Sequence, residues 1–140
     1  MSGKSWVGTT SVPKPEPGRT ITESVSIVSA LSDADTVRCF TTADGLSGWL
    51  DSVTKFDSRR GGTLKFEPGY AGSYSLINIP THVVLATELH GEVDVRIQAK
   101  SSPIMVDVTI TRFVRESEDV ESVRATLQRT LYEVQELLHA

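Results

Sequence analysis

The metal and redox chemistry open to this chain depends on very few side chains. Its three histidines, His82, His90 and His139, do not pair with another histidine, a cysteine or a carboxylate at the spacing of a metal site. His82 and His90 lie eight residues apart, and an extended chain of that length spans about 25 Å. The sequence therefore predicts neither a metal site nor a cofactor.

Nucleophilic and acid–base groups are also sparse. Cys39 stands next to Phe40, which the pattern predicts to be buried, and no base can be assigned to it, so a structural thiol is favoured. Acid–base catalysis requires two groups whose environments separate their pKa values. The candidates near strand centres or at a cavity rim are Glu88, His90, Glu92, Asp94 and Arg112. Arg112 is in phase with the apolar row of its strand and could reach an anionic ligand, although ion pairing at the strand end is the favoured alternative.

Trp49 is the most specific candidate for a ligand-binding residue. It stands between a glycine and a leucine, where its ring could stack on a ring-bearing ligand at the mouth of a cavity. Packing against the last helix is the favoured alternative, and both can hold together.

Four basic residues lie near Gly61-Gly62 in the sequence. The paired glycines themselves predict a tight hairpin. This glycine pair does not open a helix, so it is not a phosphate-binding loop. The neighbouring basic residues are expected to form a solvated turn and not a nucleic-acid-binding patch: Lys55, Arg59, Arg60 and Lys65.

Length and charge narrow the possible classes of protein. With 140 residues, the chain is expected to form one domain. Its net charge of −4 argues against a nucleic-acid-binding face. The single cysteine suits a reducing compartment, and no apolar run is long enough for a membrane span. No secretory signal is evident either, so a cytoplasmic location is expected.

The first nineteen residues and the rest of the chain have different compositions. Residues 1–19 carry Pro13, Pro15 and Pro17, which predict a flexible, proline-rich leader. The ordered domain is expected over residues 20–140. It opens with a half-buried strand, in which Ile21, Val25 and Ile27 share one face.

Two short helices and a series of strands are expected next. Ser32 should cap the first helix, whose buried face includes Val37 and Phe40, and the second helix spans Asp44 to Leu50. Strands then begin at Val53 and continue over residues 63–67, 74–79, 82–89, 93–100 and 104–110.

A long helix should end the chain, from about Glu118 to His139. Its apolar residues recur at steps of three and four and form one stripe: Val120, Val123, Leu127, Leu131, Val134 and Leu138. These elements predict an α+β protein, in which a curved antiparallel sheet of about six to seven strands wraps around the terminal helix. The gap between sheet and helix would be a natural ligand cavity.

Four stretches carry a resemblance to a known family: ITESVSI, FTTADGLSGWL, FDSRRGGTLKF and GSYSLINIPTHVVLATEL. In this order they resemble the helix-grip (SRPBCC, START-like) superfamily of START lipid-transfer domains, polyketide cyclases and the birch-pollen allergen group. The sequence is most similar to bacterial relatives of the activator of the heat-shock chaperone ATPase (AHSA-type). The resemblance covers Thr20 to the end of the chain and implies the helix-grip fold.

Three functions remain open, and a non-catalytic module that binds a small hydrophobic ligand is favoured. The alternatives are a protein-interaction module of chaperone-activator type and a cyclase- or hydrolase-like enzyme that uses the same cavity. Either a monomer or a homodimer is compatible with the sequence, since Tyr132 lies off the apolar stripe. The predicted ligand-binding residues are Phe40, Trp49, Phe66, Leu85, Val95, Ile97, Val108, Ile110, Arg112, Leu127, Leu131 and Val134.

Overall fold

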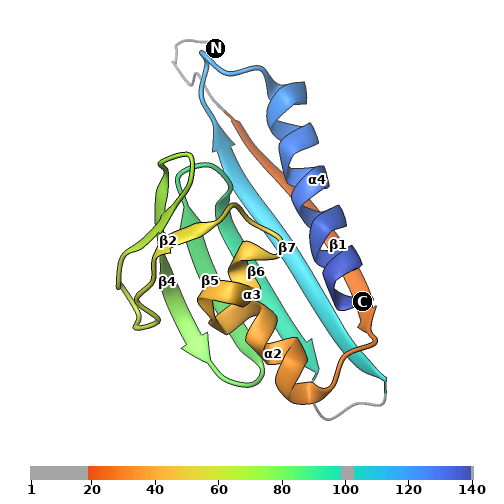
Figure 1. Cartoon of the computed structure of the whole chain (residues 1–140). Helices are drawn as coiled ribbons and strands as arrows, with labels where there is room; N and C mark the ends of the chain where they lie inside the picture. Colours follow the sequence, from red (N-terminus) through yellow and green to blue (C-terminus); the bar gives the residue numbers. More distant parts are fainter. Residues whose placement is uncertain (1–18, 99–102, 140) are drawn as a thin grey trace, which may run out of the picture.

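The computed structural model describes residues 19–98 and 103–139 (Figure 1). Of the predicted leader, residues 1–18 lie outside the described residues, and Arg19 begins the first strand. The elements follow in the order β1 (Arg19–Ser29), α2 (Asp33–Thr41), α3 (Ala43–Ser47), β2 (Val53–Lys55), β3 (Leu64–Phe66), β4 (Ala71–Asn78), β5 (His82–Thr87), β6 (Gly91–Gln98), β7 (Ile104–Val114) and α4 (Val120–Leu138).

The strands form one antiparallel sheet in the order β1-β7-β6-β5-β4-β3-β2. The two longest strands, β1 and β7, pair in register over their full lengths, from Arg19 opposite Val114 to Ser29 opposite Ile104. Apolar side chains alternate with polar ones along both strands, so one face of this pair is buried and the other faces solvent. The predicted α+β architecture is confirmed.

The helices lie on the concave face of the sheet (Figure 1). The long helix α4 runs along β1 and β7, whereas α2 and α3 cover the neighbouring strands. One hydrophobic cluster joins both groups of helices to the sheet, and it includes Phe40 of α2, Leu46 of α3 and Leu127 of α4. All three side chains are fully buried.

Side-chain caps fix where the helices begin. The predicted cap is confirmed, because Ser32 accepts a hydrogen bond from the backbone N–H of Asp35. Thr42 caps α3 in the same way. The predicted start of α4 at Glu118 is wrong by two residues, because Asp119 is the N-cap and the Glu118 carboxylate is bound to Arg112 instead.

The predicted tight hairpin at Gly61-Gly62 is also wrong. The strands β2 and β3 are short, and residues 56–63 form a longer connection between them. Gly61 alone of the pair has a positive φ, +80°. A Cβ at Gly62 would lie 2.3 Å from the Asp57 carboxyl carbon, so a larger residue there would displace the Asp57 side chain.

Candidate ligand-binding groove

A groove of about 410 Å³ lies between α4 and two loops that face it. This volume is within the range of small-molecule sites, about 300–1,000 Å³. The loop after α3 contributes Gly48, Trp49, Leu50 and Asp51, the β5–β6 turn contributes Leu89 and His90, and α4 contributes Thr126, Arg129, Thr130 and Glu133.

A smaller hollow of about 140 Å³ continues the groove toward the beginning of α4. Leu89 and Thr126 line both spaces, so the two hollows adjoin at these side chains. Arg112 and Glu118 lie in the wall of the smaller hollow. Together the hollows follow about three turns of α4.

Trp49 is anchored on α2 and forms part of the groove wall. Its indole N–H donates to the Cys39 carbonyl over 2.9 Å, and its ring meets Phe40 edge-on with 5.6 Å between centroids. The side chain is only 3% exposed. The tryptophan therefore packs against α2 as well as lining the groove, and little of its ring is open to stack on a ligand.

His90 is a buried histidine at the groove wall. Its Nδ1 lies 3.0 Å from Thr87 Oγ1, which also accepts the backbone N–H of His90 over 2.8 Å. Burial lowers the pKa of His90 to about 4, although the nearby Asp51 carboxylate acts in the opposite direction. The imidazole is therefore neutral at pH 7.

Tyr70 packs against the ring of His90. Its ring stacks on Phe66 at a centroid distance of 4.8 Å and meets the His90 ring edge-on at 5.7 Å. The Tyr70 Oη atom is buried and lies beside Asp51. Burial raises the pKa of this hydroxyl, and its interaction with the Asp51 carboxylate raises the pKa further, whereas the backbone of Asp51 acts in the opposite direction.

Arg112 forms the ion pair predicted as the alternative to anion binding. Its guanidinium binds both carboxylate oxygens of Glu118, at 2.9 and 2.8 Å. Its Nε donates to the Leu89 carbonyl over 2.7 Å, and its Nη1 donates to the Phe113 carbonyl over 2.9 Å. Arg112 therefore ties β7 to the β5–β6 turn and to the start of α4, and its donors are largely occupied.

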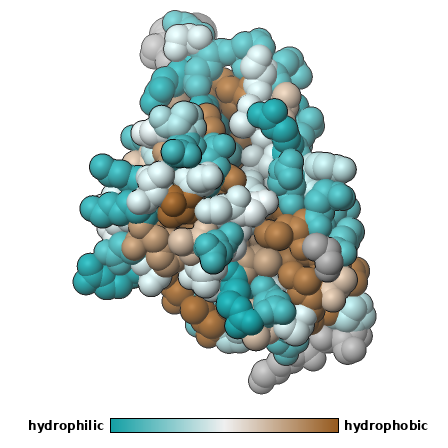
Figure 2. Space-filling view, viewed as in Figure 1, coloured by the Kyte–Doolittle hydropathy of each residue, from teal (hydrophilic) through white to brown (hydrophobic). Residues whose placement is uncertain are grey.

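The other ten predicted ligand-binding residues are packed into the core. Each is at most 7% exposed, and all belong to the single hydrophobic cluster beneath the helices. The two hollows have other linings. On the face seen in Figure 2, apolar atoms appear as separate patches among polar side chains. The ten core residues are Phe40, Phe66, Leu85, Val95, Ile97, Val108, Ile110, Leu127, Leu131 and Val134.

Several groove residues carried no signal that periodicity could detect. Asp51 lies in the loop between α3 and β2, and Tyr70, which contacts the groove residue His90, lies in the loop between β3 and β4. On α4, Thr126 and Thr130 flank the apolar stripe one turn apart, and Thr130 is buried although it is polar.

Within residues 19–98 and 103–139, no group of three or more histidine, cysteine, aspartate or glutamate side chains could hold a metal ion. Across the same part of the chain, no helix is long and apolar enough to cross a membrane. Cys39 is buried, and burial raises the pKa of its thiol, so it is a poor nucleophile.

No protein-family model matches the sequence, and no curated protein matches it. Solved structures do match. An uncharacterized protein from Rhizobium leguminosarum superposes with a TM-score of 0.68 at 14% identity, over 86% of this chain and 95% of that one.

Two further matches carry the name of the family that the sequence resembles. The Aha1 dimer from Colwellia psychrerythraea has a TM-score of 0.62 at 17% identity, over 86% of this chain and 96% of that chain. The AHSA1-like protein from Aeromonas hydrophila has a TM-score of 0.59 at 16% identity, over 84% and 91%. The structural neighbours of this chain thus include AHSA1-like proteins, and the predicted helix-grip fold is confirmed.

Proposed function

We propose that the chain is a binding module whose ligand lies in the groove between α4 and the two facing loops. The observation that carries the proposal is a hollow of small-molecule size, walled by elements that a continuous core holds in place. The residues predicted to line a cavity would then support the groove from beneath instead of touching the ligand.

The walls suit a small and partly hydrophobic molecule. Leu50 and Leu89 offer apolar surface, and polar groups of α4 face them across the hollow. A ligand that buries roughly 200 Å² of apolar surface gains about 5 kcal/mol at 25 cal/mol per Å². Ordering costs reduce this gain, so affinities no tighter than about 0.2 mM, reaching into the millimolar range, are expected for simple probes.

Filling the groove tests the proposal. Thr126→Trp places an indole where the two hollows adjoin, whereas Ala125→Trp places the same group on an exposed part of α4 outside either lining. We expect the neutral fluorophore prodan to bind the unaltered protein and the Ala125→Trp variant, and to lose at least tenfold in affinity with Thr126→Trp. Equal binding by both variants would place the probe elsewhere and refute the groove as the site.

Native mass spectrometry of the purified chain provides an independent measurement. A retained molecule that is absent from Thr126→Trp, but present in Ala125→Trp, supports the same site.

A protein-interaction module is the second candidate, and the edge strand β1 favours it. This strand stands at one end of the sheet, and among the described residues no strand pairs with its outer edge. Unpaired edges invite another strand. On the convex face nearby, Val28 and Phe113 are about half exposed. The Aha1 neighbour from Colwellia psychrerythraea is itself a dimer.

Sedimentation equilibrium between 5 and 200 µM tests self-association through this edge. We expect a dimer that Ser24→Lys on β1 weakens, because a charged side chain there opposes pairing. Glu92→Lys, on the inner strand β6, serves as the control and should leave the dimer unchanged. A monomer throughout this range would count against an edge-paired homodimer.

A further inference from the structure

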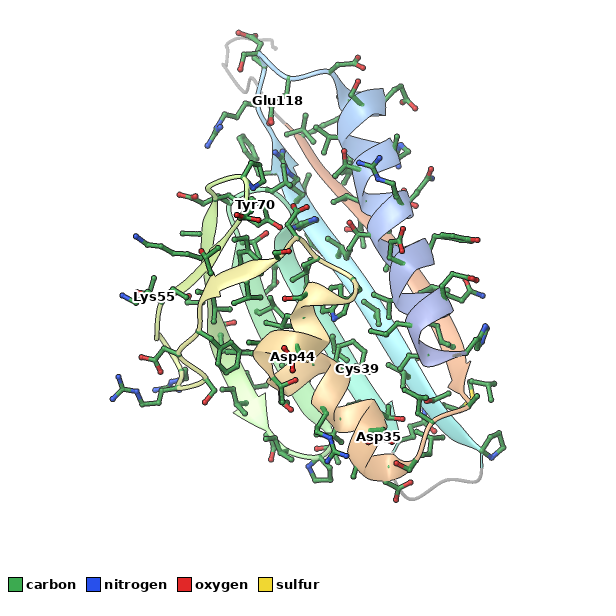
Figure 3. All side chains as sticks on the ribbon, in the orientation of Figure 1. Asp35, Cys39, Asp44, Lys55, Tyr70 and Glu118 are labelled. Atoms are coloured by element: carbon green, nitrogen blue, oxygen red, sulfur yellow. The ribbon has the colours of Figure 1, made fainter. Side chains whose placement is uncertain are left out.

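The smaller hollow is lined by polar residues whose hydrogen bonds are already made within the protein. Arg112 and Glu118 bind each other through two hydrogen bonds, of 2.9 and 2.8 Å, and Figure 3 shows Glu118 at the end of the molecule where α4 begins. The Ser122 hydroxyl donates to the Asp119 carboxylate over 2.7 Å, and the Thr126 hydroxyl donates to the Ser122 carbonyl over 3.1 Å. Every polar side chain that lines this hollow therefore has a partner in the protein.

The rest of this wall is apolar. The remaining lining residues are Leu89, which is 36% exposed, and Val123, which is partly buried. A polar ligand group in this hollow would leave water for a wall whose hydroxyl donors are engaged and whose cation, Arg112, is neutralised by Glu118. A hydrocarbon group loses no hydrogen bonds on entering and gains from the burial of its surface. The smaller hollow therefore favours a hydrocarbon group.

The larger hollow differs because it keeps charged side chains that are open to a ligand. Arg129 and Glu133, one turn apart on α4, are exposed, and neither forms an ion pair with another of the residues that the structure describes. Asp51 adds a third exposed charge on the facing loop. These charges can bind a polar group by hydrogen bonds, but an anion would meet two carboxylates and one guanidinium. The larger hollow therefore favours a polar group that carries no negative charge.

We propose that the groove binds an elongated amphiphile in one orientation, with a short hydrocarbon tail in the smaller hollow and a polar head without negative charge in the larger one. The inference rests on the proposed groove function and adds the chemistry and the direction of the ligand. Leu89 and Thr126, which line both hollows, would contact the ligand where tail and head meet. The tail must be short, because the smaller hollow measures about 140 Å³ and a single water takes about 30 Å³.

1-Octanol tests the orientation by NMR. Val123 lines only the smaller hollow, whereas Leu50 and Thr130 line only the larger one. We expect intermolecular nuclear Overhauser effects from the terminal methyl of 1-octanol to the Val123 methyls, and from its carbinol CH₂ group to Leu50 or Thr130. Shortening the tail to that of 1-hexanol should weaken binding about three- to fourfold for each methylene removed. Octanoate, which has the same number of carbons and an anionic head, should bind more weakly than 1-octanol.

Two leucine substitutions near the start of α4 locate the tail. Ser122→Leu fills the smaller hollow, and the backbone N–H at this position keeps its hydrogen bond to the Asp119 cap. Glu121→Leu adds the same group outside both linings. We expect the first variant to bind 1-octanol at least tenfold more weakly than the unaltered protein, and the second to bind it with unchanged affinity.

Each contrary result has a separate meaning. Overhauser effects from the methyl end to Leu50, or equal binding of 1-octanol by the two leucine variants, would overturn the placement of the tail and leave the groove standing. Tighter binding of octanoate would overturn the choice of head group. Absence of contacts to Val123, Leu50 and Thr130 would refute the whole inference. The groove function falls with it only if prodan also binds equally to Thr126→Trp and Ala125→Trp.

Discussion

Replacing Glu118 with glutamine should reduce the stability of the fold at neutral pH and leave it nearly unchanged in strong acid. The Glu118 carboxylate receives two hydrogen bonds from Arg112 and one from the backbone N–H of Arg115. These interactions lower its pKa from an ordinary value of 4.5 to about 2, and the Arg112 hydrogen bonds are the largest cause. Glutamine keeps the shape of the side chain and removes the charge.

The size of the effect follows from the pKa change. A fall from 4.5 to about 2 corresponds to at most about 3.4 kcal/mol of unfolding free energy above pH 5. A quarter of the Glu118 side chain is exposed, and solvent screening weakens such pairs. We therefore expect Glu118→Gln to cost roughly 1–2 kcal/mol at pH 7.

The pH dependence gives the sharper test. A carboxylate whose pKa is lowered by folding stabilises the native state above its unfolded pKa, and this stabilisation is lost as pH falls from about 5 to 2. Urea unfolding at pH 7, 5, 3.5 and 2.5 should show the two proteins converging in acid. Burial of His90 and the lowered pKa of Asp57 also weaken the fold in acid, but they act equally on both proteins. A difference that stays constant from pH 7 to pH 2.5 would refute the ion-pair reasoning.

Three smaller changes test the helices above the groove by thermal or urea unfolding. Gly45→Ala should destabilise by more than about 2 kcal/mol despite the better helix propensity of alanine, since its Cβ would lie 2.1 Å from a backbone oxygen of α2. Gly48→Ala is the control and should cost far less, since its Cβ would lie 3.2 Å from both the Gly45 carbonyl oxygen and a movable tip of Leu137. Trp49→Phe should cost about 1–3 kcal/mol because the Cys39 carbonyl loses its donor, and an unchanged midpoint would argue against that bond. Ser32→Ala removes the cap of α2 and should cost about 1 kcal/mol, whereas a stabilised variant would contradict the cap.

Much of the fold could be predicted because its elements obey simple periodicities. The alternation of Ile21, Val25 and Ile27 with polar residues defines which face of β1 is buried, and Ile104 to Ile110 do the same for β7. The stripe of α4 needs a partner surface, and the apolar rows of the strands supply it. The Ser32 cap was readable for the same reason, since a hydroxyl before an acidic first turn satisfies local amide groups.

The candidate site could not be predicted by these means. Alternation indicates that Val95 or Ile110 points inward, but it does not indicate whether the space that each one faces is empty or filled. In the structure α2, α3 and α4 fill it, and both side chains are fully buried. The groove lies instead where loops meet the flank of α4, and its polar residues follow no period. Arg112 was placed correctly at a strand end because its phase and its charge together required a partner there.

The position of the groove follows from how the two groups of helices are held. The C-terminal part of α4 is fixed closely to its surroundings, since the backbone N–H of Ala30 donates to the Leu138 carbonyl and Gly48 approaches the Leu137 side chain. Further toward its N-terminus, α4 is held from the β1 side, where Arg124 binds Glu23 over 2.7 Å. Beyond Gly48, the loop after α3 is anchored on α2 through the indole N–H of Trp49. One wall of the groove is thus bound to α2 and the other to β1, which holds the two walls apart.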